Sequence, residues 1–192
     1  MTEKILPLPV KKNKFGQRVA DISVDDYYRQ IMEEVLEAHA EDLLWTAAIN
    51  DIEDAQAEEL ADVITCCITR FDVRHQYDDE PFDVESVVVD ALKRYRDNYQ
   101  GNFYVELAAK VLYAFNAAKT AEFVEELLFG SESGCNRCVI EFELDADEET
   151  LLADIIALCV KRLDFLGYDE DVRQKLYQDV NDKNKLRGYF ED

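Results

Sequence analysis

Residues 59–71 read ELADVITCCITRF, and their apolar side chains recur with the spacing of an α-helix. Leu60, Val63, Ile64, Cys67 and Phe71 stand at positions i, i+3, i+4, i+7 and i+11, so they share one face of a helix. This pattern predicts a helix from about residue 52 to 75 that buries that face in a core.

The rest of the chain favours the same kind of structure. Only 6 Gly and 3 Pro occur in 192 residues, which is too few for the tight turns of a β-sandwich or barrel. We therefore expect an all-α fold, a helical bundle, behind an extended arm at residues 1–23. Further helices are expected at about 25–47, 84–98, 104–129, 148–166 and 169–186, with a loop at 130–137 and a strand or extended connector at 139–144.

The charge of the chain narrows the possible partners. With 21 basic and 43 acidic residues the net charge is −22, so binding to nucleic acid or to anionic lipid is not expected. No apolar run is long enough for a transmembrane helix, and residues 1–17 lack the apolar segment of a signal peptide. The thiols Cys66, Cys67 and Cys159 fall in apolar helical stretches and are expected to be buried, which favours a cytoplasmic protein.

The sequence contains two related halves. Glu33-Glu34-Val35-Leu36 is similar to Glu125-Glu126-Leu127-Leu128, and Leu60-Ala61-Asp62-Val63-Ile64 is similar to Leu152-Ala153-Asp154-Ile155-Ile156. Both matches have the same offset of 92 positions. We interpret the region 24–192 as a degenerate tandem duplication, with repeat 1 at about 24–100 and repeat 2 at about 101–192.

Four acids of the first repeat form a candidate metal site. Glu34 and Glu37 on one helix, and Glu59 and Asp62 on the next, are each spaced i, i+3, so each pair lies on one side of its helix beside the apolar stripe. If the two stripes pack together, four carboxylates meet at the rim of the core, where only protons or a cation make them tolerable. Oxygen ligands without His or Cys suit Mg²⁺, with Mn²⁺ as the alternative. The competing interpretation is an ordinary solvated helix face.

A resemblance to a known family supports the metal interpretation. Glu33-Glu34-x-x-Glu37, followed after 21 residues by Glu59-x-x-Asp62, resembles the acidic signature of the all-α nucleoside triphosphate pyrophosphohydrolases, which include MazG, the dimeric dUTPases and phosphoribosyl-ATP pyrophosphatase. The segment Asp182-Lys183-Asn184-Lys185-Leu186-Arg187-Gly188-Tyr189-Phe190 is similar to the ending of MazG-like proteins.

The resemblance implies a function and roles for these residues. Glu34, Glu37, Glu59 and Asp62 would hold Mg²⁺, and Glu33 or Glu37 would act as the general base that orients a water molecule. Lys183, Asn184 and Arg187 would contact the phosphates of a nucleoside triphosphate, which would be cleaved to pyrophosphate and a nucleoside monophosphate. Arginine offers a fork of donors and lysine a point charge for this purpose.

The second repeat departs from the acidic signature. Phe129 stands where repeat 1 has Glu37, and Leu151 stands where it has Glu59. Half of the ligands are therefore missing, and we expect no metal there. The chain is expected to act as a monomeric pseudo-dimer or as a homodimer.

Two other functions are compatible with the sequence. One is a non-catalytic nucleotide-binding or regulatory relative, and the other is an acidic helical adaptor protein. Cys135-x-x-Cys138 lacks the two further ligands that a structural zinc ion needs, so we expect ordinary thiols there. Trp45, Tyr27 and Tyr28 are candidates for stacking on a base, but core packing is the more common role of such side chains.

Overall fold

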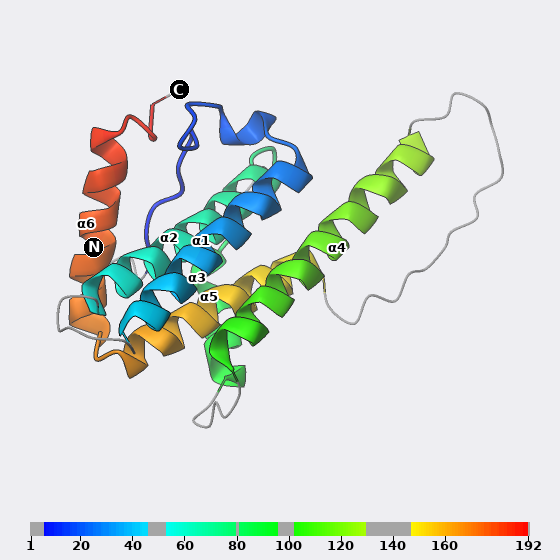
Figure 1. Cartoon of the computed structure of the whole chain (residues 1–192). Coiled ribbons are helices and arrows are strands. Elements are labelled where there is room, and N and C mark those ends of the chain that lie inside the picture. Colours follow the sequence, from blue (N-terminus) through cyan, green and yellow to red (C-terminus); the bar gives the residue numbers. More distant parts are fainter. Residues whose placement is uncertain (1–5, 46–52, 80, 96–101, 130–146, 192) are drawn as a thin grey trace.

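The described part of the chain is built from α-helices (Figure 1). The computed structural model describes residues 6–45, 53–79, 81–95, 102–129 and 147–191. In these ranges the extended pairing consists of one isolated bridge between Lys12 and Arg18. The helices are η1 (Val19–Asp21), α1 (Val24–Trp45), α2 (Glu53–Arg74), α3 (Val84–Arg94), α4 (Phe103–Phe129), α5 (Glu148–Phe165) and α6 (Glu170–Leu186).

Local side chains fix the beginnings of these helices. Asp83, Asp147 and Asp169 precede α3, α5 and α6, and each accepts a hydrogen bond from a backbone N–H of the first turn. Such capping satisfies donors that have no partner within the helix. Ser23 does the same for α1, because its Oγ accepts from the backbone N–H of Asp26 at 3.1 Å.

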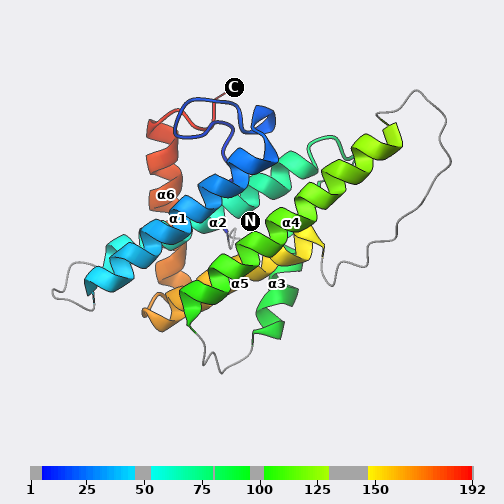
Figure 2. The ribbon, with the colours of Figure 1, turned by 45° about the vertical axis from the view of Figure 1, so that its right-hand side comes forward.

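Four long helices form the body of the fold. α1 packs against α2 and α4 against α5, with the members of each pair running in opposite directions (Figure 1). The pairs join through contacts of α1 with α4 and of α2 with α5. Helix α3 packs on α5, and α6 crosses to pack on α2, so each shorter helix contacts the pair from the other half of the sequence (Figure 2).

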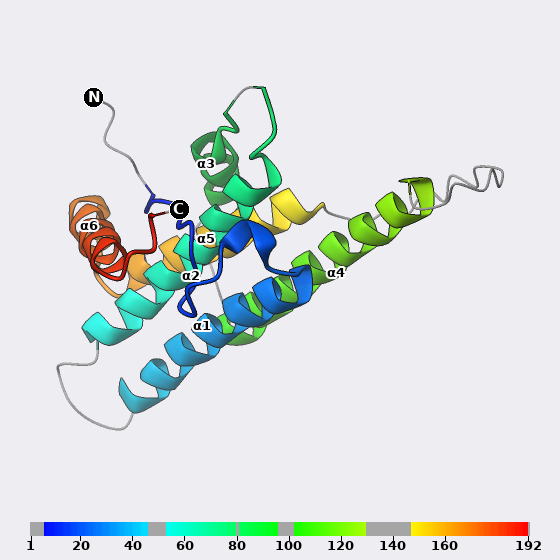
Figure 3. The ribbon, with the colours of Figure 1, turned by 90° about the horizontal axis from the view of Figure 1, so that it is seen from above.

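Helix α5 lies at the centre of the molecule. Every residue from Leu151 to Val160 is buried, because α2, α3 and α4 pack on it from different sides (Figure 3). A helix that is covered all round needs no polar face, and this explains why residues 151–160 contain only one charged side chain, Asp154.

The N-terminal arm is attached to α2 and to the C-terminal tail. The backbone N–H of Val10 donates to Thr69 Oγ1 on α2 at 3.0 Å. The N–H groups of Lys11 and Lys12 donate to the carbonyl oxygen of Tyr189 at 2.7 and 3.0 Å. These bonds join the two ends of the described chain above the α1–α2 pair.

The structure confirms the predicted all-α class, and most helix ends lie within two residues of the expected positions. The third helix is shorter than predicted, since it ends at Arg94. The expected strand or connector at 139–144 and the cysteines Cys135 and Cys138 lie outside the described residues.

Among the helices that the structure describes, none combines the length and the apolar character that crossing a membrane requires.

Candidate metal and phosphate site

The packing of α1 against α2 brings carboxylates from both helices together. One carboxylate oxygen from each of Glu34, Glu59 and Asp62 lies within 4.8 Å of the others. Glu34 comes from the middle of α1, while Glu59 and Asp62 lie one turn apart on α2. We call these three residues the acidic cluster.

The carboxylates of the acidic cluster repel one another even though basic side chains lie nearby. Burial, followed by the charges of Asp62 and Glu37, raises the pKa of Glu34 to about 7. Burial and the same two acids raise the pKa of Glu59 to about 6. Both glutamates thus hold a proton more tightly than usual, and a divalent cation relieves the same repulsion.

The other two glutamates named from the sequence lie in different places. Glu37 lines the same pocket as the acidic cluster but is not one of its three close carboxylates. Glu33 is not among the residues that line the pocket, and its Oε2 atom lies 3.0 Å from Lys14 Nζ. Of the two, Glu37 is therefore the one that faces the pocket.

Helix α6 and its tail bring basic side chains to the acidic cluster. Lys183, Asn184 and Arg187 all line the pocket. Lys183 Nζ donates to Asp62 Oδ2 at 3.0 Å and lies 3.8 Å from Glu58 Oε2. Burial lowers the pKa of Lys183, but the Asp62 carboxylate outweighs it, so the pKa is raised and the side chain stays charged.

The pocket between the acids and the bases has a volume of about 200 Å³. It is formed by the N-terminal arm, by α1 and α2, and by α6 with its tail. Its lining residues are Val10, Lys12, Asn13, Lys14, Gln30, Glu34, Glu37, Glu59, Asp62, Thr65, Cys66, Lys183, Asn184, Arg187 and Tyr189.

Sequence reasoning missed the contribution of the arm. Lys12, Asn13 and Lys14 line the pocket, although they are more than 160 positions from Lys183 in the sequence. An extended segment has no helical periodicity that would assign its side chains to a face. The three closely spaced lysines at 11, 12 and 14 were the only signal in a strongly acidic chain.

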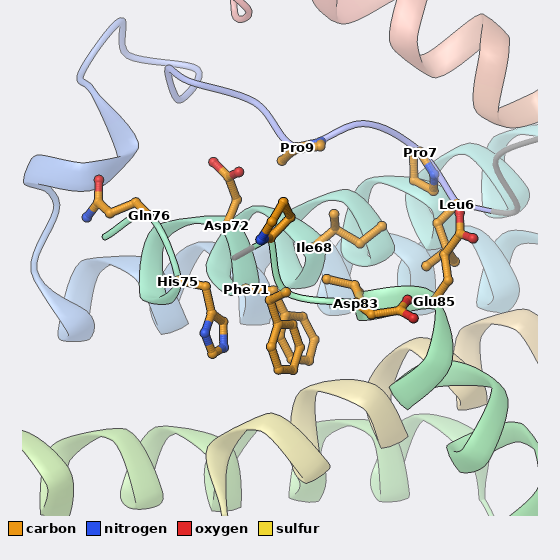
Figure 4. Close-up of a pocket in the computed structure, with 13 residues that line it drawn as sticks. Leu6, Pro7, Pro9, Ile68, Phe71, Asp72, His75, Gln76, Asp83 and Glu85 are labelled. Carbon is orange, nitrogen blue, oxygen red and sulfur yellow. The ribbon is translucent and has the colours of Figure 1, made fainter. Parts of the chain in front are cut away.

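A second, larger hollow lies further along α2, and Figure 4 shows the side chains around it. Its volume is about 360 Å³, and the arm residues Leu6, Pro7 and Pro9 lie over Ile68 and Phe71 of α2. Its described lining contains no lysine or arginine but includes three acids, Asp72, Asp83 and Glu85. This hollow is therefore unsuited to a phosphate chain, despite its size.

Asp154, which stands 92 positions after Asp62, has a different environment. Asp154 on α5 accepts a hydrogen bond from Arg94 on α3 and another from Lys110 on α4, both at 2.7 Å. Leu151, which stands 92 positions after Glu59, is buried in the core. Two cations thus neutralise a single carboxylate here. The side chains of Glu126 and Phe129 lie outside the described residues.

The aromatic and thiol predictions have mixed outcomes. Tyr27 and Tyr28 are buried in the core, so they are not available to stack on a base. Cys67 and Cys159 are buried as predicted, but Cys66 is only partly buried and lines the pocket. The side chain of Trp45 lies outside the described residues.

Comparisons of the chain with protein families, with curated proteins and with solved structures found no match.

Proposed function

We propose that the chain is a magnesium-dependent nucleoside triphosphate pyrophosphohydrolase that releases pyrophosphate and a nucleoside monophosphate. The proposal is carried by the convergence, in one pocket, of the acidic cluster with Lys183 and Arg187. Acids alone suit a cation and bases alone suit an anion. Their combination suits a phosphate chain that is bound together with a divalent cation.

The residues of the acidic cluster fit Mg²⁺ or Mn²⁺. They offer hard oxygen donors within 4.8 Å of one another, and the described neighbourhood contains no His or Cys ligand set that would favour zinc. Glu34, Glu59 and Asp62 would hold the ion, with Glu37 as the further carboxylate that the family resemblance adds. A bound ion supplies charge neutralisation at the phosphate oxygens.

The side chains of the pocket would perform the remaining tasks. Lys183 and Arg187 would bind phosphate oxygens, because an ammonium and a guanidinium both donate to such oxygens through charge-assisted hydrogen bonds. Glu37 faces the pocket and is the better placed general base, whereas the Glu33 carboxylate is paired with Lys14. The base would take the proton from a water molecule that attacks phosphorus, and the leaving group would be pyrophosphate.

We also propose that the chain is a fused pseudo-dimer. Arg70 on α2 forms an ion pair with Glu148 on α5 at 2.8 Å. Arg162 on α5 stands 92 positions after Arg70, and Gln56 on α2 stands 92 positions before Glu148. These two residues also meet across the helices, because both donate to Asp42 Oδ1, at 2.5 and 3.0 Å. The same offset relates the sequence repeats. The packing of α3 on α5 and of α6 on α2 also supports a pseudo-dimer, because each of these helices contacts the helix pair of the other half.

The direct experiment supplies a panel of ribo- and deoxyribonucleoside triphosphates together with Mg²⁺. We expect pyrophosphate and the monophosphate as products, and no products in EDTA. Glu37→Gln should abolish turnover while leaving the protein folded. Release of orthophosphate alone, or of nothing from the whole panel, would refute the proposal. Tight nucleotide binding without turnover would instead identify a regulatory nucleotide-binding protein.

A further inference from the structure

A tight turn in the N-terminal arm holds Lys14 beside the acidic cluster. The N–H of Gly16 donates to the carbonyl oxygen of Asn13 at 2.9 Å, which closes a β-turn with Lys14 at its first corner. Gly16 has a φ of +75°, a conformation that glycine adopts without strain. Asn13 is buried, and its Oδ1 accepts from the backbone N–H groups of Phe15 and Gln17 at 3.0 and 2.9 Å. The backbone of Lys14 is thus fixed in place.

The turn is also attached to the part of the chain that carries the other cations. Helix α6 ends in a Schellman motif, in which Gly188 has a φ of +72° and the N–H of Tyr189 donates to Asn184 O at 3.0 Å. This reversal directs the Tyr189 carbonyl oxygen to the N–H groups of Lys11 and Lys12. These hydrogen bonds attach the arm that carries Lys14 to the end of the helix that carries Lys183.

The two lysines flank the acidic cluster from different segments, Lys14 from the N-terminal arm and Lys183 from α6. Lys14 Nζ lies 3.0 Å from Glu33 Oε2 and 4.0 Å from Glu34 Oε1, both on α1. Lys183 Nζ lies 3.0 Å from Asp62 Oδ2 on α2. Both lysines line the pocket. A ligand that enters between them would meet an ammonium group on each side.

We infer that Lys14 is a further phosphate-binding residue, which contacts a metal-bound phosphate chain from the α1 side while Lys183 contacts it from the α2 side. The inference rests on the proposed function for the identity of the ligand. In the free protein the Lys14 ammonium is paired with glutamates. A cation at Glu34 reduces the negative charge beside this ammonium, and phosphate oxygens then compete with Glu33 for it.

The ligand class follows from the size and lining of the pocket. Its volume of about 200 Å³ is below the roughly 300–1,000 Å³ of pockets that enclose a whole drug-sized ligand. The space between Lys14 and Lys183 therefore suits the phosphate chain alone. Inorganic tripolyphosphate is accordingly the simplest probe of this inference, because it has the chain without a base or sugar.

The test measures tripolyphosphate binding in Mg²⁺ by calorimetry for the wild type, Lys14→Ala, Lys14→Arg and Lys11→Ala. Lys11 provides a matched control, because it belongs to the same arm but its Nζ pairs with Asp72 at 2.7 Å outside the pocket. We expect Lys14→Ala to weaken binding about tenfold or more, Lys14→Arg to retain most of the affinity, and Lys11→Ala to stay within about twofold of the wild type. Equal affinities for Lys14→Ala and Lys11→Ala would overturn the inference.

Further outcomes separate this inference from the proposed function. Thermal unfolding of Lys14→Ala should match the wild type, and Lys14→Gln is a second variant if it does not. Pyrophosphate release by the wild type, together with a Lys14→Ala protein that has unchanged affinity, would refute the role of Lys14 alone. Tripolyphosphate binding that depends on Lys14, without hydrolysis of any nucleotide, would refute the hydrolase alone. A wild type that binds no tripolyphosphate would refute the role of Lys14, while the nucleotide panel would decide the hydrolase separately.

Discussion

Asp62 and Asp154 stand 92 positions apart in similar sequences, yet their environments differ in charge. Asp154 is a single carboxylate between Arg94 and Lys110, so its negative charge is neutralised by the protein itself. Asp62 shares its surroundings with Glu34 and Glu59, and among the described side chains Lys183 is the one that donates a hydrogen bond to it. The Asp154 environment thus functions as a structural ion pair. The acidic cluster keeps an excess of negative charge that a divalent cation is suited to neutralise.

The largest expected effect is on turnover. Asp62→Asn and Glu59→Gln each remove a proposed metal ligand, and we expect either change to lower pyrophosphate release by at least about a hundredfold. Asp154→Asn changes the aspartate 92 positions later and should leave turnover unchanged. Neither Asp154 nor its partners Arg94 and Lys110 line the pocket. Steady-state assays of the three variants make the measurement. An equal loss in all three would abolish the distinction between the two aspartates.

The second effect is on stability, and here the change at Asp154 should matter more than the change at Glu59. Asp154→Asn removes the buried carboxylate that pairs with Lys110 and with the half-exposed Arg94, so the free energy of unfolding should fall by about 1–3 kcal/mol. Glu59→Gln removes one of several crowded acids and should cost no stability in EDTA at pH 8. Urea unfolding of both variants provides the test. The prediction fails if Glu59→Gln is the more destabilised of the two.

The third effect is a dependence of stability on pH. In the folded protein the pKa of Glu34 is about 7, above the ordinary 4.5, so folding favours the protonated acid. The stability that this provides is complete below about pH 4.5 and is lost as the pH rises through 7. Glu34→Gln should therefore stabilise the metal-free protein by about 1–3 kcal/mol at pH 8 and by little near pH 4.5.

Urea unfolding in EDTA at the two pH values measures this difference. If Glu34→Gln were neutral or destabilising at pH 8, the acids would not repel one another as the distances in the acidic cluster imply.

Much of this comparison could be predicted from the sequence. Helical periodicity placed Glu34 on one helix and Glu59 and Asp62 on the next, and it identified the apolar faces that pack together. Comparison of the two halves at an offset of 92 positions places Leu151 and Phe129 opposite Glu59 and Glu37, which predicts an incomplete set of acids in the second half. Such features follow from the order of residues along a helix, so the sequence alone reveals them.

The partners of these acids were not predictable in the same way. Arg94 and Lys110 reach Asp154 from two other helices, and Lys14 reaches the acidic cluster from an arm without periodicity. Such pairs depend on how the helices cross and on the bonds between Lys11, Lys12 and the Tyr189 carbonyl oxygen. No local sequence pattern encodes these contacts, because their members lie far apart in the chain.

Thermal unfolding of the wild type with and without Mg²⁺ tests most directly whether the acidic cluster binds a divalent cation. At a hundredfold excess over the dissociation constant, linkage stabilises the fold by about 2.7 kcal/mol, which corresponds to an increase in Tm of roughly 5–10 °C for a chain of this size. We expect this increase in the wild type and its loss in Glu59→Gln. An unchanged Tm in the wild type, or an equal increase in both proteins, would contradict a metal site at the acidic cluster.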